Sequence, residues 1–117
     1  MSHSDLVNIT MVTYNRLEYT RRTLDALFAT TTHPYALTVV DNDSSDGTRE
    51  YLRQLHEAGK IHHLGLFRRN VGVSCAANYG WDQVDAPFYL RLDNDIVLRK
   101  EGWLERMLDV AKRTPEL

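Results

Sequence analysis

Four short runs of strand-forming residues alternate along this chain with stretches of helical spacing, and this alternation constrains the fold more than any other feature. The runs span residues 7–14, 36–40, 61–67 and 88–92, and the second is apolar at nearly every position. A strand covered on both faces has this composition, and strands that alternate with helices pair in parallel. We therefore predict an α/β fold of three layers, α/β/α, with a mainly parallel sheet.

Apolar residues at intervals of three and four predict a helix after each strand. Asn15 is expected to cap the first helix, and Ser45 or Asp46 the second. The third helix has an inner face of small residues, which suits close packing on a sheet, and Cys75 is expected to be a small core residue there. The other residues expected to pack in the interior are Leu17, Leu24, Leu27, Phe28, Thr48, Tyr51, Leu52, Leu55, Ala76, Ala77, Gly80, Trp81, Val84, Trp103, Leu104, Met107, Leu108 and Ala111.

The chain has 117 residues, which suits one compact domain, so we assign residues 1–117 to a single unit. A formal net charge of −2 gives no overall attraction to nucleic acid, and no stretch has the length of apolar sequence that spans a membrane. Cys75 is the one cysteine, and the N-terminal residues lack the features of a signal peptide. The sequence therefore predicts a cytoplasmic protein with no nucleic-acid partner and no transmembrane segment.

A polar motif follows each predicted strand. The motifs occupy residues 13–16, 41–48, 68–72 and 93–95. In an open parallel sheet the carboxyl ends of the strands share one edge, and ligands bind outside that edge. We expect the four loops to converge on one rim.

Asp93 and Asp95 stand two positions apart at the end of the fourth run. Alternate side chains of an extended segment point the same way, so the two carboxylates are expected to converge. A hard divalent cation such as Mg²⁺ or Mn²⁺, which binds oxygen and bridges to phosphates, suits such a pair. By contrast, His62 and His63 are adjacent and point to opposite faces, and we interpret them as structural.

Asp41 and Asn42 offer a carboxylate and an amide, groups that pair with a pyrimidine edge or a ribose hydroxyl. The remainder of their motif is typical of a turn and a helix cap. A calcium loop of the EF-hand type is excluded, because Asp46 stands where the invariant glycine belongs and Leu52 where the bidentate glutamate belongs.

Asn70, Gly72 and Asn78 lie around the start of the predicted third helix. Glycine permits close backbone approach there, and the free N–H groups favour an anion, so a phosphate or a sugar is the expected ligand. Arg68 or Arg69 is a candidate to neutralise a diphosphate.

Together these motifs resemble the N-terminal half of a family 2 glycosyltransferase of the GT-A fold. Members of that family transfer a sugar from a nucleotide diphosphate donor to an acceptor hydroxyl, on a saccharide or a lipid-linked acceptor, usually with inversion and with a divalent metal on the diphosphate. The resemblance implies a sheet ordered 3-2-1-4 and a DxD motif in which Asp93 and Asp95 hold the metal, with Asp95 as the principal ligand. The segments that carry it are 12–16, 40–48, 70–78 and 92–95.

The resemblance also implies roles for the other motif residues. Thr13 and Tyr14 would line the base pocket, and Asp41 and Asn42 would face the base or the ribose. The remaining residues expected at the nucleotide sugar are Asn15, Arg16, Asn70, Gly72, Asn78 and Asn94.

Two positions depart from the family pattern. Many relatives carry a second acidic residue in place of Asn42, and many carry arginine in place of Ala77, which bears on base preference and on the diphosphate contacts. In this family the general base and most of the acceptor pocket follow the DxD strand, so the chain is expected to be truncated before its acceptor half. Truncation would expose apolar surface and favour self-association. In the full-length enzyme the domain is expected at the inner face of the membrane.

Two functional hypotheses follow from the sequence. The first is a glycosyltransferase donor-binding domain, and the second is a nucleotide-binding or interaction module without catalysis. A nucleotidyltransferase and a dinucleotide oxidoreductase are disfavoured, because the first strand is not followed by a glycine-rich loop and no G-x-G-x-x-G is present.

Overall fold

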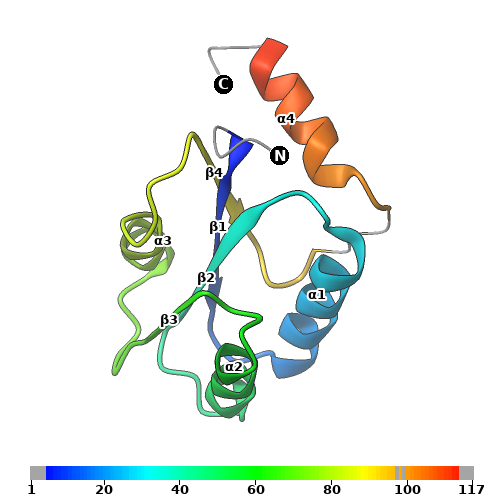
Figure 1. The fold of residues 1–117 in the computed structure, drawn as a ribbon. Helices are drawn as coiled ribbons and strands as arrows, with labels where there is room; N and C mark the ends of the chain where they lie inside the picture. Colours follow the sequence, from blue (N-terminus) through cyan, green and yellow to red (C-terminus); the bar gives the residue numbers. More distant parts are fainter. Residues whose placement is uncertain (1–4, 97, 99, 114–117) are drawn as a thin grey trace.

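The computed structural model describes residues 5–96, 98 and 100–113 and has a parallel sheet at its centre (Figure 1). The strands lie in the order β3-β2-β1-β4, as predicted. The strands are β1 (Val7–Thr13), β2 (Tyr35–Asp41), β3 (His63–Leu66) and β4 (Phe88–Leu92). The helices are α1 (Leu17–Thr30), α2 (Thr48–Glu57), α3 (Val73–Trp81) and α4 (Trp103–Arg113).

One face of the sheet carries the apolar core. The register pairs Ile9 with Leu37 and with Leu90, so these three side chains share a face. Helices α1, α2 and α4 supply the other half of this core, through Leu24, Leu52 and Leu104 among others. Figure 1 shows these helices on one side of the sheet and α3 on the opposite side, which gives the predicted three layers.

The opposite face is small and polar, and α3 packs closely against it. Thr10 of β1 is fully buried under Gly80 of α3, where a Cβ added to the glycine would stand 2.4 Å from the threonine methyl carbon. The buried residues of α3 are Ala76, Ala77 and Gly80, as the pattern of small residues predicts. Asn8 fixes the end of this layer by donating to the carbonyl of Val84 at 2.9 Å.

Some local predictions were wrong. Cys75 is exposed, because the buried stripe of α3 runs through Ala76, Ala77 and Gly80 and leaves the cysteine on the outer side. Val84 lies beyond the end of α3 in the loop that leads to β4. The third strand is also shorter than residues 61–67, since only His63–Leu66 pair with β2.

Both tryptophans pack as predicted. Trp103 is packed against the core and donates from Nε1 to the Thr31 hydroxyl at 2.8 Å. Trp81 is half-buried and meets Tyr89 edge to face, with the ring centroids 6.3 Å apart.

Within the described part of the chain, no helix combines the length and the apolar character needed to cross a membrane.

The close approach of α3 to β1 is tested by Gly80→Ala. The added methyl group would overlap Thr10, so the unfolding free energy is expected to fall by about 1–3 kcal/mol despite the better helix propensity of alanine. Urea unfolding measures this change. Ser74→Ala, at an exposed position of the same helix, is the control and is expected to stay within about 0.5 kcal/mol of the wild type. A Gly80→Ala variant as stable as the wild type would contradict this packing of α3 on β1.

Candidate functional site

Loops from the carboxyl ends of the strands surround one hollow of about 390 Å³, here called the rim hollow. This volume falls within the range of small-molecule sites. Loops that follow β1, β2, β3 and β4 all contribute to it, because parallel strands deliver their polar motifs to one edge. The residues that line it are Val12, Thr13, Tyr14, Arg16, Asn42, Asn70, Gly72, Val73 and Asn94.

Asp41, the last residue of β2, is the centre of a hydrogen-bond network beneath the rim. Its side chain is fully buried. It accepts hydrogen bonds from the Thr13 hydroxyl at 2.8 Å, from the Ser44 backbone and hydroxyl at 2.8 and 2.5 Å, and from Arg49 at 3.1 Å. The sequence predicts that Asp41 faces a ligand, but in the structure its carboxylate is bonded to protein partners. Asp41 therefore organises the rim and does not line it.

Asn42 joins the β2 loop to the β3 loop. Its side-chain oxygen accepts from the Val71 backbone at 3.2 Å, and its side-chain nitrogen donates to the Gly72 carbonyl at 3.3 Å. Asn42 is 1% exposed and still forms part of the wall of the rim hollow. An aspartate at this position would accept from Val71 but could not donate to Gly72.

The loop after β1 is held by the loop after β2. The Asn15 side chain accepts from the Ser45 backbone at 2.8 Å, and the Asn15 backbone donates to the Ser44 hydroxyl at 2.7 Å. Asn15 and Arg16 both adopt left-handed backbone conformations, with φ of 54° and 59°. Non-glycine residues rarely stay in this region unless their surroundings fix them, and the two loops fix each other here.

Asp46 caps two helices at once. Its carboxylate accepts from the Leu17 backbone at the start of α1, at 3.0 Å, and from the Thr48 backbone at the start of α2, at 3.1 Å. The prediction of Asn15 as the cap of α1 was wrong, because Arg16 occupies the cap position and the acceptor comes from Asp46. Desolvation opposes the charged form, but the hydrogen bonds from Thr48 and Leu17 outweigh it and lower the pKa of Asp46.

The loop after β4 brings an amide to the hollow and leaves its carboxylates in solvent. Asn94 lines the hollow and donates to the Thr20 hydroxyl at 3.1 Å. Asp93 and Asp95 are exposed, and Asp93 lies 3.7 Å from the Arg91 guanidinium. The strand ends at Leu92 and Asp95 lies in a turn, so strand alternation does not set the direction of the two carboxylates.

Most of the residues predicted for the site therefore meet at one place. Asn15 and Asp41 lie behind the wall of the rim hollow, and Asp93 and Asp95 flank Asn94. Asn78 is exposed on α3 and does not line the hollow. The predicted residues that do line it are Thr13, Tyr14, Arg16, Asn42, Asn70, Gly72 and Asn94.

Sequence reasoning missed Arg49 and the hydroxyl of Ser44. The signal for Arg49 was its position in the first turn of α2, where the helix dipole disfavours a cation unless an acidic partner is near. The partner is Asp41.

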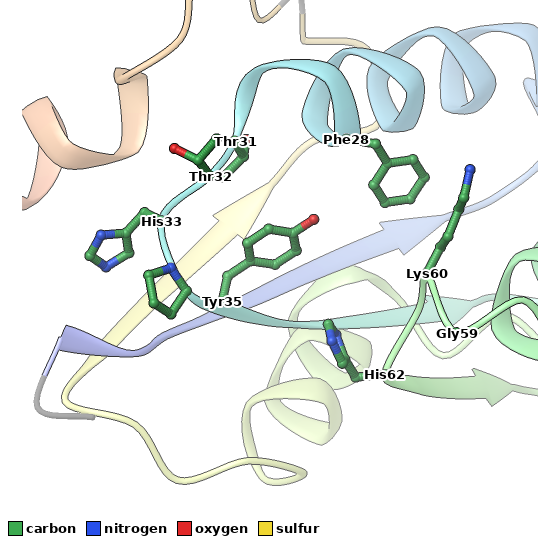
Figure 2. A pocket seen from close by; sticks show the side chains of 9 residues that line it. Phe28, Thr31, Thr32, His33, Tyr35, Gly59, Lys60 and His62 are labelled. Carbon is green, nitrogen blue, oxygen red and sulfur yellow. The ribbon is translucent and has the colours of Figure 1, made fainter. Parts of the chain in front are cut away.

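A second hollow lies at the opposite end of β2 and β3, and Figure 2 shows its lining. Its volume is about 360 Å³. Three of its polar side chains already have protein partners. His33 bonds the Asp5 carbonyl at 2.7 Å, His62 accepts from the Leu37 backbone at 2.8 Å, and Lys60 lies over the Phe28 ring. We therefore interpret this hollow as structural.

The role of His62 supports that interpretation. Its Nδ1 atom accepts a backbone hydrogen bond, so the ring proton is on Nε2. Partial desolvation of the ring and the neighbouring His63 lower the pKa of His62, which favours the neutral ring at pH 7. The prediction of a structural role is confirmed for His62.

A family model described as glycosyl transferase family 2 matches residues 8–117 of this chain. The chain belongs to this family. Glycosyltransferase AglE of Haloferax volcanii is 32% identical over 111 residues, which are 92% of this chain and 36% of that protein. Validoxylamine A glucosyltransferase of Streptomyces hygroscopicus subsp. limoneus is 32% identical over 100 residues, or 82% of this chain and 22% of that protein. This family 2 chain thus spans well under half the length of these relatives.

Solved structures share the fold of this family 2 domain. The mannosyltransferase PcManGT of Pyrobaculum calidifontis, in complex with GDP-Man and Mn²⁺, gives a TM-score of 0.77 at 22% identity, over 90% of this chain and 32% of that one. TarS of S. aureus, in complex with UDP-GlcNAc, gives 0.75 at 20% identity, over 92% and 31%. These likenesses confirm the predicted GT-A fold.

The double cap at Asp46 is tested by Asp46→Asn. Asparagine keeps one acceptor oxygen, so one of the two helix starts loses its cap, and the unfolding free energy at pH 7 is expected to fall by about 1–2 kcal/mol. The lowered pKa means that the contribution of Asp46 is present above the ordinary pKa of an aspartate and is lost as the pH falls through the lowered value. Denaturant unfolding at pH 7 and near pH 3 is therefore expected to give a smaller difference at the lower pH.

Asp43→Asn is the matched control for that experiment. Asp43 is an exposed carboxylate of the same loop with φ of 69°, a conformation that asparagine tolerates. It is expected to change stability little at either pH. Equal losses in the two variants would show that Asp46 contributes through loop charge and not through capping.

Proposed function

We propose that this family 2 chain is the donor-binding half of an inverting glycosyltransferase and that the rim hollow holds a nucleotide diphosphate sugar. The observation that carries the proposal is the convergence of four strand-end loops on one hollow lined by amides, a hydroxyl, an aromatic ring and one guanidinium. Supporting it, relatives are named as glycosyltransferases and a neighbour was solved with UDP-GlcNAc.

The groups that line the hollow suit different parts of the proposed ligand. Tyr14 is 50% exposed and offers its ring for stacking on a base, next to the Thr13 hydroxyl. Asn70 is exposed and offers its amide to the base or the ribose. Asn42, whose amide is already bonded to Val71 and Gly72, has only its second N–H and its second oxygen lone pair for the same ligand. The Arg16 guanidinium is the cation of the wall that suits a diphosphate. We assign Asp41 and Asn15 to holding these groups in place.

Three further roles are proposed near this hollow. Gly72 leaves the start of α3 open to the sugar or phosphate, and Asn94 lies on the side of the hollow next to the DxD residues. Asn78 lies further along α3, outside the hollow, and we propose that it contacts the sugar moiety of the bound donor.

The residues present fit a divalent metal ion whose coordination shell is completed by substrate phosphates. Asp93 and Asp95 are exposed, and among the described residues no group of three or more acidic, histidine or cysteine side chains is arranged to hold a metal alone. Mg²⁺ and Mn²⁺ commonly bind through one or two carboxylates, with substrate phosphates and water as the other ligands. We propose that Asp95, with Asp93, holds such an ion. When bound, it would supply Lewis-acid stabilisation of the departing nucleotide diphosphate.

The chemical contribution of this chain is then to bind and orient the donor. The buried network under the rim fixes the positions of Thr13 and the β3 loop before a ligand arrives, which is the usual source of orientation in group transfer. An inverting transfer also needs a base opposite the leaving group to accept the proton of the acceptor hydroxyl. We propose that this base and the site for a saccharide or lipid-linked acceptor lie in a further part of the enzyme.

Two further proposals concern the location of the protein and an alternative function. A cytoplasmic setting, at the inner face of the membrane in the full enzyme, is in keeping with the exposed free thiol of Cys75. A non-catalytic nucleotide-binding or interaction module is the alternative function, and it is favoured only if no donor binds.

Nucleotide binding is the direct test of this function. Calorimetric titration of UDP, dTDP and GDP is expected to give binding of at least one nucleotide, and Mn²⁺ is expected to strengthen it. Asp95→Ala is expected to weaken the Mn²⁺-dependent binding by at least about tenfold, because a direct metal ligand is lost.

Asp85→Ala is the control, since Asp85 is an exposed carboxylate that precedes β4 at the opposite end of the sheet. It is expected to bind like the wild type. A wild-type chain that binds none of the three nucleotides, with or without metal, would contradict the donor-site proposal for this chain.

We also propose that copies of this chain associate through β4 and α4. β4 is an edge strand of the sheet, and beside it lies an apolar groove lined in part by Leu90 and Met107. Met107 and Val110 are 48% and 53% exposed on α4. Exposed apolar area next to an unpaired strand edge favours association.

Sedimentation measures this association. At high concentration the wild type is expected to sediment above the monomer mass, and Met107→Lys is expected to return it to the monomer because the charge disfavours burial of α4. Val73→Lys, on the exposed side of α3, is the control and is expected to leave the association unchanged. A clean wild-type monomer would contradict the proposal.

A further inference from the structure

Arg49 occupies a position that α2 alone does not explain. It lies in the first turn of the helix, where the dipole disfavours a cation, yet its side chain is only 23% exposed. Its Nη1 atom donates to the Asp41 carboxylate at 3.1 Å and to the Phe67 carbonyl at 2.7 Å. Both acceptors lie outside α2, one at the end of β2 and one just after β3.

The two acceptors are themselves joined. The Phe67 backbone donates to the Asp41 carbonyl at 2.9 Å, so Arg49 closes a ring of hydrogen bonds around the ends of β2 and β3. Loss of Arg49 would leave the buried Asp41 carboxylate without its cationic partner and the Phe67 carbonyl without this donor.

The β3 loop, residues 67–72, is fastened at both ends by this arrangement. Arg49 holds it at Phe67, and Asn42 holds it at Val71 and Gly72. Asn70 and Gly72 of this loop line the rim hollow, whereas Arg49 does not. Any effect of Arg49 on a ligand is therefore transmitted through the loop and through Asp41.

We propose that Arg49 is a positioning residue for the donor site, which fixes the β3 loop against the end of β2 so that the rim hollow is preformed. This inference rests on the proposed function. Without the tie at Phe67, the ligand must order the loop when it binds. Ordering the backbone of one residue is enough to weaken affinity by about tenfold.

The test compares Asp41→Asn with the double variant Asp41→Asn/Arg49→Met. Neither variant contains the buried carboxylate, so the double variant has no unpaired buried charge that could unfold it. The two proteins differ only at residue 49, by the Arg49 hydrogen bond to the Phe67 carbonyl and by one positive charge. The double variant is expected to bind UDP with Mn²⁺, or whichever of the three nucleotides the wild type binds, at least about tenfold more weakly than Asp41→Asn.

Arg53→Met is the matched control on the wild-type background. Arg53 lies one turn further along α2, is exposed, and pairs with Glu50. It is expected to bind the nucleotide within about twofold of the wild type. Circular dichroism confirms that each variant is folded at the titration temperature. Equal affinities for Asp41→Asn and the double variant would overturn the proposal.

Amide hydrogen exchange separates this proposal from the proposed function. In the double variant without ligand, exchange is expected to rise in residues 68–72 and to stay unchanged in the core strand β1, relative to Asp41→Asn. Unchanged exchange in residues 68–72 would overturn the positioning role whatever the affinities. A wild-type chain that binds no nucleotide would contradict the proposed function and leave the exchange result to decide the role of Arg49.

Discussion

The hydrogen bonding of the buried Asp41 carboxylate is the interaction on which the rest of the site depends. A charged group with no exposed surface is tolerated only when it is paired and hydrogen-bonded, and Thr13, Ser44 and Arg49 satisfy it together. These partners come from three different segments of the chain. By requiring all of them at once, one side chain fixes the end of β1, the β2 loop and the start of α2 relative to one another.

The unequal faces of the sheet explain why such a network can sit at its edge. The large apolar side chains lie on the face covered by α1, α2 and α4. On the other face, Thr10 of β1 meets the small residues Ala76 and Gly80 of α3. Close packing there brings α3 and the loop before it near the strand ends. A rigid scaffold then presents short loops, which is how α/β proteins generally position ligands.

Much of this was predictable from the sequence, because it depends on pattern. The alternation of elements, the small inner face of α3 and the placement of four polar loops at one edge follow from residue type and spacing. The direction of individual polar side chains did not follow. Asp41 was expected to face a ligand and Asn15 to cap α1, but Asp41 bonds Thr13 and Arg49, Asn15 bonds Ser45, and Asp46 caps α1. Sequence spacing carries no information on which distant segment supplies a partner. The prediction that Cys75 is buried was wrong because of the helical phase. Cys75 lies next to the buried stripe of α3 but on its exposed side.

Paramagnetic mapping tests the central claim, that the rim hollow is the nucleotide and metal site, most directly. Amide resonances of the labelled chain would be recorded with UDP and a small amount of Mn²⁺, which broadens signals near the bound ion. Broadening is expected to centre on residues 93–95, to extend to Tyr14 and Gly72, and to need the nucleotide. Broadening centred instead on the acidic surface near Asp5 and Asp109, with residues 93–95 unaffected, would contradict this claim.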